Sequence, residues 1–330
     1  MSSFILNMKR FISNMQLGSV KRKLSKYGIF MALIFLIILF GALRPETFFT
    51  LTNMMIILRQ ISINGILAIG MAYVIITGGI DLSVGSILAF SAIVAANFAH
   101  PGGHSIMIVI LVALFVGAIL GAINGVVIAA GNIPPFIVTL GMMTVARGLT
   151  QLSNGGRPVN NLDPTFNYIG GGSIFGIPIP VIIFIFIIGI AWFLLNKTKF
   201  GRYALAVGGN RATAEVSGIN TKKIIALTYI LSGVLAGISG MILTSRVQSA
   251  LVGAGMGYEL DAIAGAVIGG TSMSGGKGTI GGTVIGVLII GILSNGLDLT
   301  GISSYYQQII KGIIIVAAVL FDKKSKGKTT

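Results

Sequence analysis

The residue types that perform catalysis are scarce in this chain, and their spacing argues against the common active sites. Cysteine is absent, which excludes thiolate metal ligands and a thiol nucleophile. His100 and His104 are four residues apart, but a Pro-Gly-Gly run between them prevents the helix that would bring both rings to one metal. The glycine loop 276–279 (GKGT) lacks the spacing of a nucleotide-binding P-loop. We therefore predict no enzyme activity, no cofactor and no metal site, and an energy source outside the chain.

Polar side chains inside the apolar segments form a second group of candidates. The following five could offer hydrogen bonds to a hydroxylated solute: Gln60, Asn64, Asp81, Asn124 and Thr139. Each equally fits a hydrogen bond between helices. Asp81 also fits a helix cap, since it lies beside glycines where the backbone is irregular. Ionisable residues at membrane depth are costly and often functional, and the remaining ones are Arg59, Arg147, Glu259, Asp261 and Lys311. We predict that a translocation path is lined by the five hydrogen-bonding candidates, Gln60, Asn64, Asp81, Asn124 and Thr139.

The elements that must position these residues are membrane helices. The chain of 330 residues is 54% hydrophobic and 9% charged, which is more apolar surface than one soluble core can bury. With roughly 20 apolar residues needed per crossing, we predict ten spans in an all-α polytopic fold. They lie near 29–43, 54–77, 80–99, 105–130, 133–152, 179–196, 223–246, 258–271, 280–298 and 305–321. We interpret the first as an uncleaved span rather than a signal peptide, because Arg44 and Pro45 stand where a cleavage site would be.

Charge predicts the orientation of these spans. Most of the 23 Lys and Arg residues lie in the N-terminal segment 1–28, in the loop 197–223 and in the tail 323–330. An even number of spans places all three segments on one face, and cytoplasmic loops retain Lys and Arg. We predict that both termini and the loop 197–223 are cytoplasmic, with the segments 1–28 and 323–330 flanking a membrane domain at 29–322 that contains this loop. The net charge of +15 then reflects membrane topology and not a nucleic-acid partner.

Glycine patterns predict breaks and close packing. The segment 269–278 is too glycine-rich for a continuous helix, and the run 78–85 (GGIDLSVG) has a similar double-glycine start. We expect broken helices near both. Small residues recur every four positions from Ala113 to Ala129, and this spacing lets another helix approach closely. The longest translocated loop is 153–180.

The loop 197–223 contains the clearest functional signal. Asn210 is a good N-cap for a short helix through Ser217, which Gly218 would end as a C′ residue. A short amphipathic helix between two cytoplasmic ends of spans is typical of a docking element, although a solvated connector has the same pattern.

At these residues the chain resembles the permeases of ribose-type ATP-binding-cassette importers, from the branched permease family. The resemblance rests on GGIDLSVGS (78–86), NGGRPV (154–159), GRYALAVGGNRATAEVSGI (201–219), GYELDAIAGAVIGGTSMSGGKG (257–278) and SSYYQ (303–307). It covers roughly residues 45–322.

This resemblance implies a homodimeric pore in the lipid membrane, a cytoplasmic ATP-binding-cassette subunit and an external sugar-binding protein. The residues it assigns to coupling with the ATPase are Arg202, Asn210, Ala214, Glu215, Gly218 and Ile219. Ribose is the expected substrate. Two other classes stay open at this point, a stand-alone secondary carrier or channel for a small polar solute, and a membrane scaffold without transport.

Overall fold

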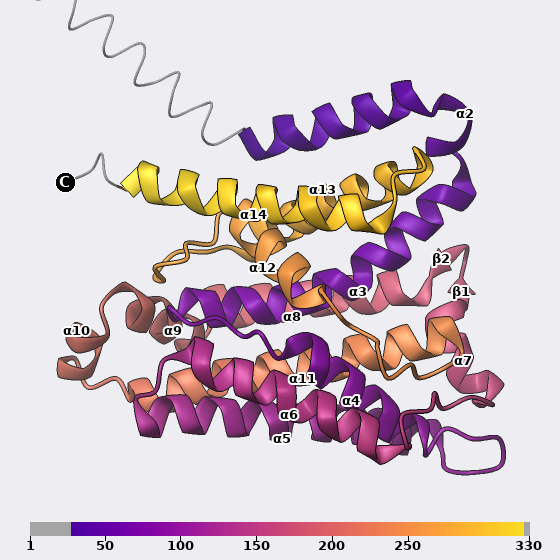
Figure 1. Cartoon of the computed structure of the whole chain (residues 1–330). Helices are drawn as coiled ribbons and strands as arrows, with labels where there is room; N and C mark the ends of the chain where they lie inside the picture. Colours follow the sequence, from indigo (N-terminus) through magenta and orange to yellow (C-terminus); the bar gives the residue numbers. More distant parts are fainter. Residues whose placement is uncertain (1–27, 327–330) are drawn as a thin grey trace, which may run out of the picture.

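The computed structural model describes residues 28–326. The basic N-terminal segment up to residue 27 and the last four residues of the tail lie outside the described residues. The chain forms a bundle of roughly parallel and antiparallel helices (Figure 1). We call the end with α9 (Lys199–Gly209) and α10 (Arg211–Val216) the α10 end. We call the end with α7 (Pro164–Gly171) and the strands β1 (Ser173–Ile174) and β2 (Ile177–Pro178) the hairpin end. The first described helix, Gly28–Leu43, runs toward the hairpin end, and α14 (Ser304–Lys326) runs back toward the α10 end.

Each of the ten predicted spans corresponds to a helix. These are Gly28–Leu43, α3 (Leu51–Ile76), α4 (Val84–Ala96), α5 (Ile106–Gly131), α6 (Pro135–Ser153), α8 (Ile179–Lys197), α11 (Thr221–Val247), α12 (Tyr258–Ile268), α13 (Ile280–Leu299) and α14 (Ser304–Lys326). Five of them, α3, α5, α8, α11 and α13, are long and apolar enough to cross a membrane. The described part of the chain is therefore all-α, apart from the two-residue strands β1 (Ser173–Ile174) and β2 (Ile177–Pro178).

Four short helices lie between these elements, of which the sequence predicted α10 and missed the other three. α2 (Pro45–Phe48) follows the first helix, and α7 (Pro164–Gly171) lies with the antiparallel hairpin inside the predicted loop 153–180. α9 (Lys199–Gly209) and α10 (Arg211–Val216) fill the loop 197–223. Each lies at one end of the bundle, where the chain leaves the apolar interior (Figure 1).

Two predicted spans are wrong in length. α4 has 13 residues and α12 has 11, so they rise only about 20 Å and 17 Å across a hydrocarbon core of about 30 Å. The rest of each passage is non-helical: residues 77–83 precede α4, and residues 248–257 precede α12. The break at 248–257 was not predicted, whereas the loop 269–279 is a reversal at the α10 end (Figure 1).

The two broken passages have opposite directions. α3 runs to the α10 end, the chain turns back into the bundle, and α4 continues toward the hairpin end. α11 runs to the hairpin end, the chain turns back, and α12 continues toward the α10 end. Each half-helix packs against the long helix of the other pair, α4 on α11 and α12 on α3. The fold thus contains two inverted helix–break–half-helix units, an arrangement that many transporters use to build a site at mid-membrane.

The expected small-residue stripe on α5 packs against α11. The glycines 117, 121 and 125 each lie so close to the α11 backbone that a Cβ atom would overlap with it. Gly233 and Gly237 on α11 are equally constrained from the other side. The backbones therefore approach as closely as the spacing predicted.

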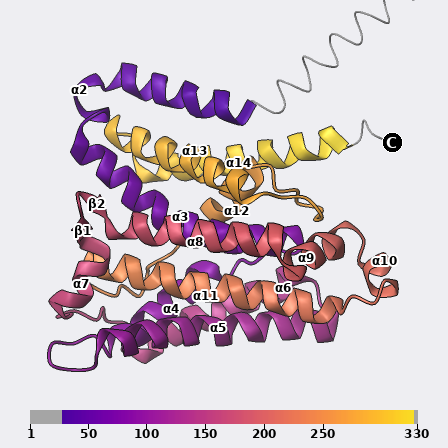
Figure 2. The ribbon, with the colours of Figure 1, turned by 180° about the vertical axis from the view of Figure 1, so that it is seen from behind.

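α3 and α11 form the centre of the bundle. Every residue of α3 from Ile61 to Ile76 is buried, as expected of a helix that is apolar all round. α5 and α8 lie on either side of α11 in the view from behind (Figure 2). Their exposed side chains are large and apolar, including Leu111, Phe115, Ile185, Phe186 and Ile190. That side of the molecule is suited to contact with lipid.

Candidate functional site

α10 forms as the sequence predicted. The Asn210 side chain accepts a hydrogen bond from the Thr213 backbone N–H at 3.0 Å, which is the expected N-cap. Gly218 follows the helix with φ of +80°, a left-handed conformation that favours glycine. The Ile219 N–H then donates to the Ala214 carbonyl oxygen at 3.0 Å and closes the turn. Both ends of this short helix are therefore fixed by the local sequence.

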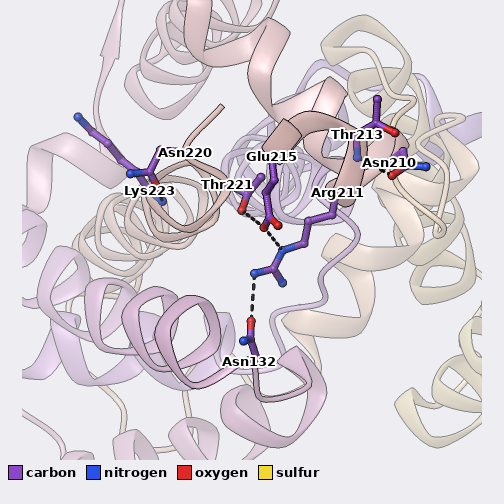
Figure 3. A network of polar contacts seen from close by, with 8 residues as sticks. All are labelled: Asn132, Asn210, Arg211, Thr213, Glu215, Asn220, Thr221 and Lys223. Carbon is purple, nitrogen blue, oxygen red and sulfur yellow. Dashed lines mark hydrogen bonds and ion pairs between the residues drawn. The ribbon is translucent and has the colours of Figure 1, made fainter. Parts of the chain in front are cut away.

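A polar network holds α10 against the ends of α5 and α11 (Figure 3). The Arg211 Nε atom donates to Glu215 Oε1 at 3.2 Å, and the Thr221 hydroxyl donates to the same oxygen at 2.6 Å. The Arg211 Nη2 atom donates to Asn132 Oδ1 at 3.1 Å, at the C-terminal end of α5. The hydrogen bond from Thr221, followed by that from Arg211, lowers the pKa of Glu215. We call Arg211, Glu215, Thr221 and Asn132 the α10 latch.

The latch leaves an apolar side chain pointing outward. Ala214 is buried beneath α10, whereas Val216 is 91% exposed at the tip of the loop. An isolated exposed valine is ordinary on a soluble surface. Here it stands on a helix that is capped, latched and raised from the bundle, which suits a contact with another protein.

The structure separates one predicted coupling residue from the rest. Arg202 is exposed on α9 and takes no part in the latch drawn in Figure 3. Arg211, Thr221 and Asn132 were missed by the sequence analysis. The i, i+4 spacing of Arg211 and Glu215 was a usable signal, but the contacts with Thr221 and Asn132 depend on tertiary structure.

α9 connects this region to the membrane interior. Gly208 packs directly on the carbonyl oxygen of Ile76, the last residue of α3, and on the backbone of Gly275 and Gly276. The Gly276 N–H donates to the Ile76 carbonyl oxygen at 2.9 Å. A displacement of α9 and α10 would therefore reach the start of the break 77–83 and the loop after α12 through backbone contacts.

Three of the predicted path residues meet at the first break. The Asp81 carboxylate is fully buried and accepts hydrogen bonds from the backbone N–H and hydroxyl of Ser83 and from the Ser232 hydroxyl at 3.1 Å. Asn124 donates to the Ser83 hydroxyl oxygen at 2.8 Å. Thr139 is also buried, and its hydroxyl lies 3.4 Å from the Ile80 carbonyl oxygen. Asp81 thus holds the backbone directly before α4 through Ser83, the N-cap residue, whose own side chain makes no capping hydrogen bond.

The other two lie apart from this cluster. Asn64 is buried on α3 and donates to Asp261 Oδ2 at 3.4 Å, beside the ion pair between that oxygen and Lys311 Nζ at 2.9 Å. Gln60 is half-buried one turn earlier on α3. Four of the five predicted path residues therefore have protein partners, and their part in a path stays a prediction.

Polar groups at membrane depth collect on one side of the bundle instead. We call this side the polar face: α6, the break 248–257, α12 and α14, which lie toward the viewer in Figure 1. Arg147, Gln151, Glu259, Gln308 and Lys311 all lie on it and line cavities there. The tip of the break carries Met256, which is 72% exposed. Charged and polar groups are costly against lipid, so this face is suited to water, a solute or another protein.

The fold and these sites define a multi-pass membrane permease. The sequence matches the family described as branched-chain amino acid transport system / permease component over residues 53–319, and the chain belongs to this family. It is 47% identical over 320 residues to the ribose import permease protein of Haemophilus influenzae, covering 96% of this chain and 97% of the relative. The corresponding protein of Bacillus subtilis is 48% identical over 303 residues, or 91% and 94% of the two chains.

A relative that is named for a different sugar shares a lower sequence identity with this chain. The D-allose transport system permease protein of Escherichia coli is 41% identical over 298 residues, covering 90% of this chain and 91% of the relative. None of the solved structures matches the chain.

Proposed function

We propose that the chain is the transmembrane permease subunit of an ATP-driven importer that carries ribose across the cytoplasmic membrane by alternating access. ATP hydrolysis belongs to a separate subunit. The observation that carries this proposal is α10, a capped and latched helix that presents Val216 outward. The preceding helix α9 contacts the end of α3 and the loop after α12 through the backbone of Gly208.

The orientation follows from the basic segments. The loop with α9 and α10 carries six Lys and Arg residues. The first described helix begins, and the last one ends, on the same side of the molecule as this loop. The positive-inside rule then makes the α10 end cytoplasmic. We infer ten membrane passages, of which those at α4 and α12 are completed by non-helical segments. Both termini are cytoplasmic in this arrangement.

The polar face supports a second copy of the chain as partner. A face with Arg147, Glu259 and Lys311 at membrane depth is unsuited to lipid, whereas the faces of α5 and α8 are suited to it. Two copies that meet with their polar faces would enclose a path between them. The symmetry of such a dimer brings the same face of each protomer together.

The hairpin end supports an external partner. Phe175, at the tip of the hairpin, is fully exposed with φ of +52°. The segment behind it is braced, since Val159 and Ala250 exchange backbone hydrogen bonds of 3.0 and 2.9 Å. A rigid platform with an apolar tip fits the docking of a sugar-binding protein. Ribose is favoured over allose because identity to the ribose permeases is higher.

Transport proceeds, on this proposal, by rigid-body motion. Closure of the ATPase dimer pushes α10, the latch transfers the push to α5 and α11, and Gly208 transfers it to Ile76 and Gly276. The broken passages then change their relative position and open the path toward the hairpin end. Release of the hydrolysis products reverses the motion.

Reconstitution tests this proposal. Proteoliposomes with the chain, its co-purifying ATPase and a ribose-binding protein should take up D-ribose only with ATP. The chain alone should show no flux down a ribose gradient. Gradient-driven flux through the chain alone would instead establish a stand-alone carrier, and activity in neither preparation would favour a scaffold.

A further inference from the structure

The polar face contains a cavity of about 500 Å³ between α6 and the start of α12. This volume lies in the range of sites for small ligands. α6 contributes Thr144, Arg147 and Gln151, and the other wall is formed by Met256 and Glu259. The cavity lies beside the meeting point of the two half-helices, because Gly85 at the start of α4 touches both Gly255 and the Glu259 carboxylate.

The two charged side chains in this cavity do not pair. No ion pair joins them, whereas Arg211 pairs with Glu215 and Lys311 pairs with Asp261. Arg147 uses Nη1 for the carbonyl oxygens of Val252 and Ala254, at 2.8 and 2.9 Å. Glu259 accepts from the Gly257 N–H at 3.2 Å through Oε1. Both groups are thus held in place by the backbone of the break, and their charges face a shared space.

Such a space selects a particular chemistry. Glu259 would repel an anion and Arg147 would repel a cation, whereas a neutral polyol donates hydroxyls to the carboxylate and accepts from the guanidinium. Gln151 and Thr144 can donate and accept. The exposed Met256 side chain offers a soft apolar surface for the C–H side of a sugar ring. The set combines apolar and polar groups in the way that ligand sites do.

The neighbouring cavity lacks such unpaired charges. A cavity of about 470 Å³ on the other side of Met256 contains Asp261 and Lys311, but these two are paired at 2.9 Å. Their charges are mutually satisfied, and Asn64 donates to the same carboxylate. This second cavity therefore presents an ion pair that bridges α12 and α14, rather than open acceptors.

We propose that the cavity between α6 and α12 is a sugar-binding subsite of the permease itself, in which Glu259 accepts hydroxyls and Gln151 donates to the ring or hydroxyl oxygens. Arg147 is a positioning residue that fixes the break 248–257. The subsite takes neutral monosaccharides and rejects phosphorylated ones, since Glu259 repels the added charge. This inference rests on the proposed function and names the site through which the sugar passes.

The absence of cysteine allows a direct test. Single substitutions Thr144→Cys and Gly148→Cys, both on the wall of the cavity, are made in the permease–ATPase complex without binding protein and treated with a small neutral, water-soluble methanethiosulfonate reagent. We expect both thiols to react and D-ribose at high concentration to slow the reaction several-fold. Ribose 5-phosphate should give no protection. Ile190→Cys on the lipid-exposed side of α8 serves as the matched control and should not react.

Two results would overturn the subsite. One is the lack of reaction at both positions, and the other is reaction at an unchanged rate in ribose. The same thiol reactions are also followed during ATP turnover without sugar. If turnover alone protected the thiols, the protection would reflect closure of the polar face, and this result would also contradict sugar binding. ATP-dependent uptake by the same complex with binding protein is measured separately, so that failure of the subsite and failure of the proposed function remain distinct.

A functional variant gives an independent readout. Glu259→Gln keeps the shape and the acceptor for the Gly257 N–H but removes the charge, and we expect ribose uptake to fall about tenfold. ATPase stimulation by the binding protein should persist, since the coupling end is untouched. Glu46→Gln, the same chemical change at an exposed position on α2, is the control and should leave uptake within twofold. Normal uptake by Glu259→Gln would contradict the proposal.

Discussion

Gly85 and Gly255 lie against each other backbone to backbone, at the point where the two broken passages meet. A Cβ atom on either residue would overlap with the carbonyl oxygen of the other. Gly255 also has φ of +71°, which L side chains rarely adopt. The contact joins the start of α4 to the break before α12, and it lies beside Glu259. The position of both half-helices therefore depends on two residues without side chains.

We predict that Gly85→Ala separates these segments. The methyl group has no space, so the variant should lose about 1–3 kcal/mol of stability and most ribose uptake. Gly141→Ala on α6 is the matched control, because a Cβ there meets no atom within 4 Å, and alanine favours the helix. The thermal midpoint in detergent and ATP-driven uptake measure both effects. Equal behaviour of the two variants would show that the contact is not required.

We predict that a single substitution in the ion pair between Lys311 and Asp261 destabilises the protein. Lys311→Met leaves an unpaired carboxylate whose side chain is only 8% exposed, and removal of one partner of a buried pair typically costs about 3–5 kcal/mol. The double variant Lys311→Met, Asp261→Asn removes both charges and should recover most of that stability. A double-mutant cycle on thermal unfolding measures the coupling. Additive losses would contradict a direct interaction between the two groups.

The α10 latch should control coupling rather than folding. Glu215→Ala removes the oxygen that both Arg211 and Thr221 contact, so we expect uptake to fall at least about tenfold while the ATPase turns over without stimulation by binding protein. Gly218→Val, which forces a side chain into φ of +80°, should behave similarly. Ala212→Ser, at an exposed neighbouring position, is the control. Amounts in the membrane are compared by quantitative blotting. Unchanged uptake would refute the assignment.

The ionisation of Glu215 sets the pH range of the latch. Because its pKa is lowered in the folded chain, the latch is fully formed above the pKa of an unfolded glutamate and is lost only as the pH falls through the lowered value. Coupled uptake should therefore not decline through Glu215 at mildly acidic pH. Thr221→Val removes the hydrogen bond that contributes most to the lowered pKa of Glu215. Any loss of coupled uptake in acid should therefore shift to higher pH in this variant.

We predict that Val216 contributes to binding of the ATPase but not to the stability of the permease. Val216→Asp places a charge on a side chain that is 91% exposed, so stability of the permease should change by less than about 0.5 kcal/mol. Co-purification of the ATPase should fall, because a charge at a buried apolar contact is left without a partner. Ser217→Asp tests whether charge near the same helix is enough. Equal loss in both variants would indicate a general electrostatic effect rather than a contact through Val216.

The sequence by itself determined the membrane class, the number and limits of most helices, and the short capped helix in the loop 197–223. These properties depend on local quantities. Apolar length decides which segments leave water, the positions of Lys and Arg decide their orientation, and Asn210 and Gly218 fix α10 through hydrogen bonds and backbone conformation within a few residues. The stripe on α5 also predicted close packing, though not its partner α11.

Only the tertiary structure decided what the polar residues do. Asp81, Asn124 and Thr139 looked suited to a solute, but each finds a partner in the protein from a distant segment or its own helix. Arg147 and Glu259 are over a hundred positions apart in the chain and share one cavity because the break 248–257 returns to mid-bundle. Apolarity and periodicity are short-range signals, whereas the pairing of a buried polar group depends on long-range packing. For this reason the helices were predictable from the sequence, whereas the partners of the buried polar residues were not.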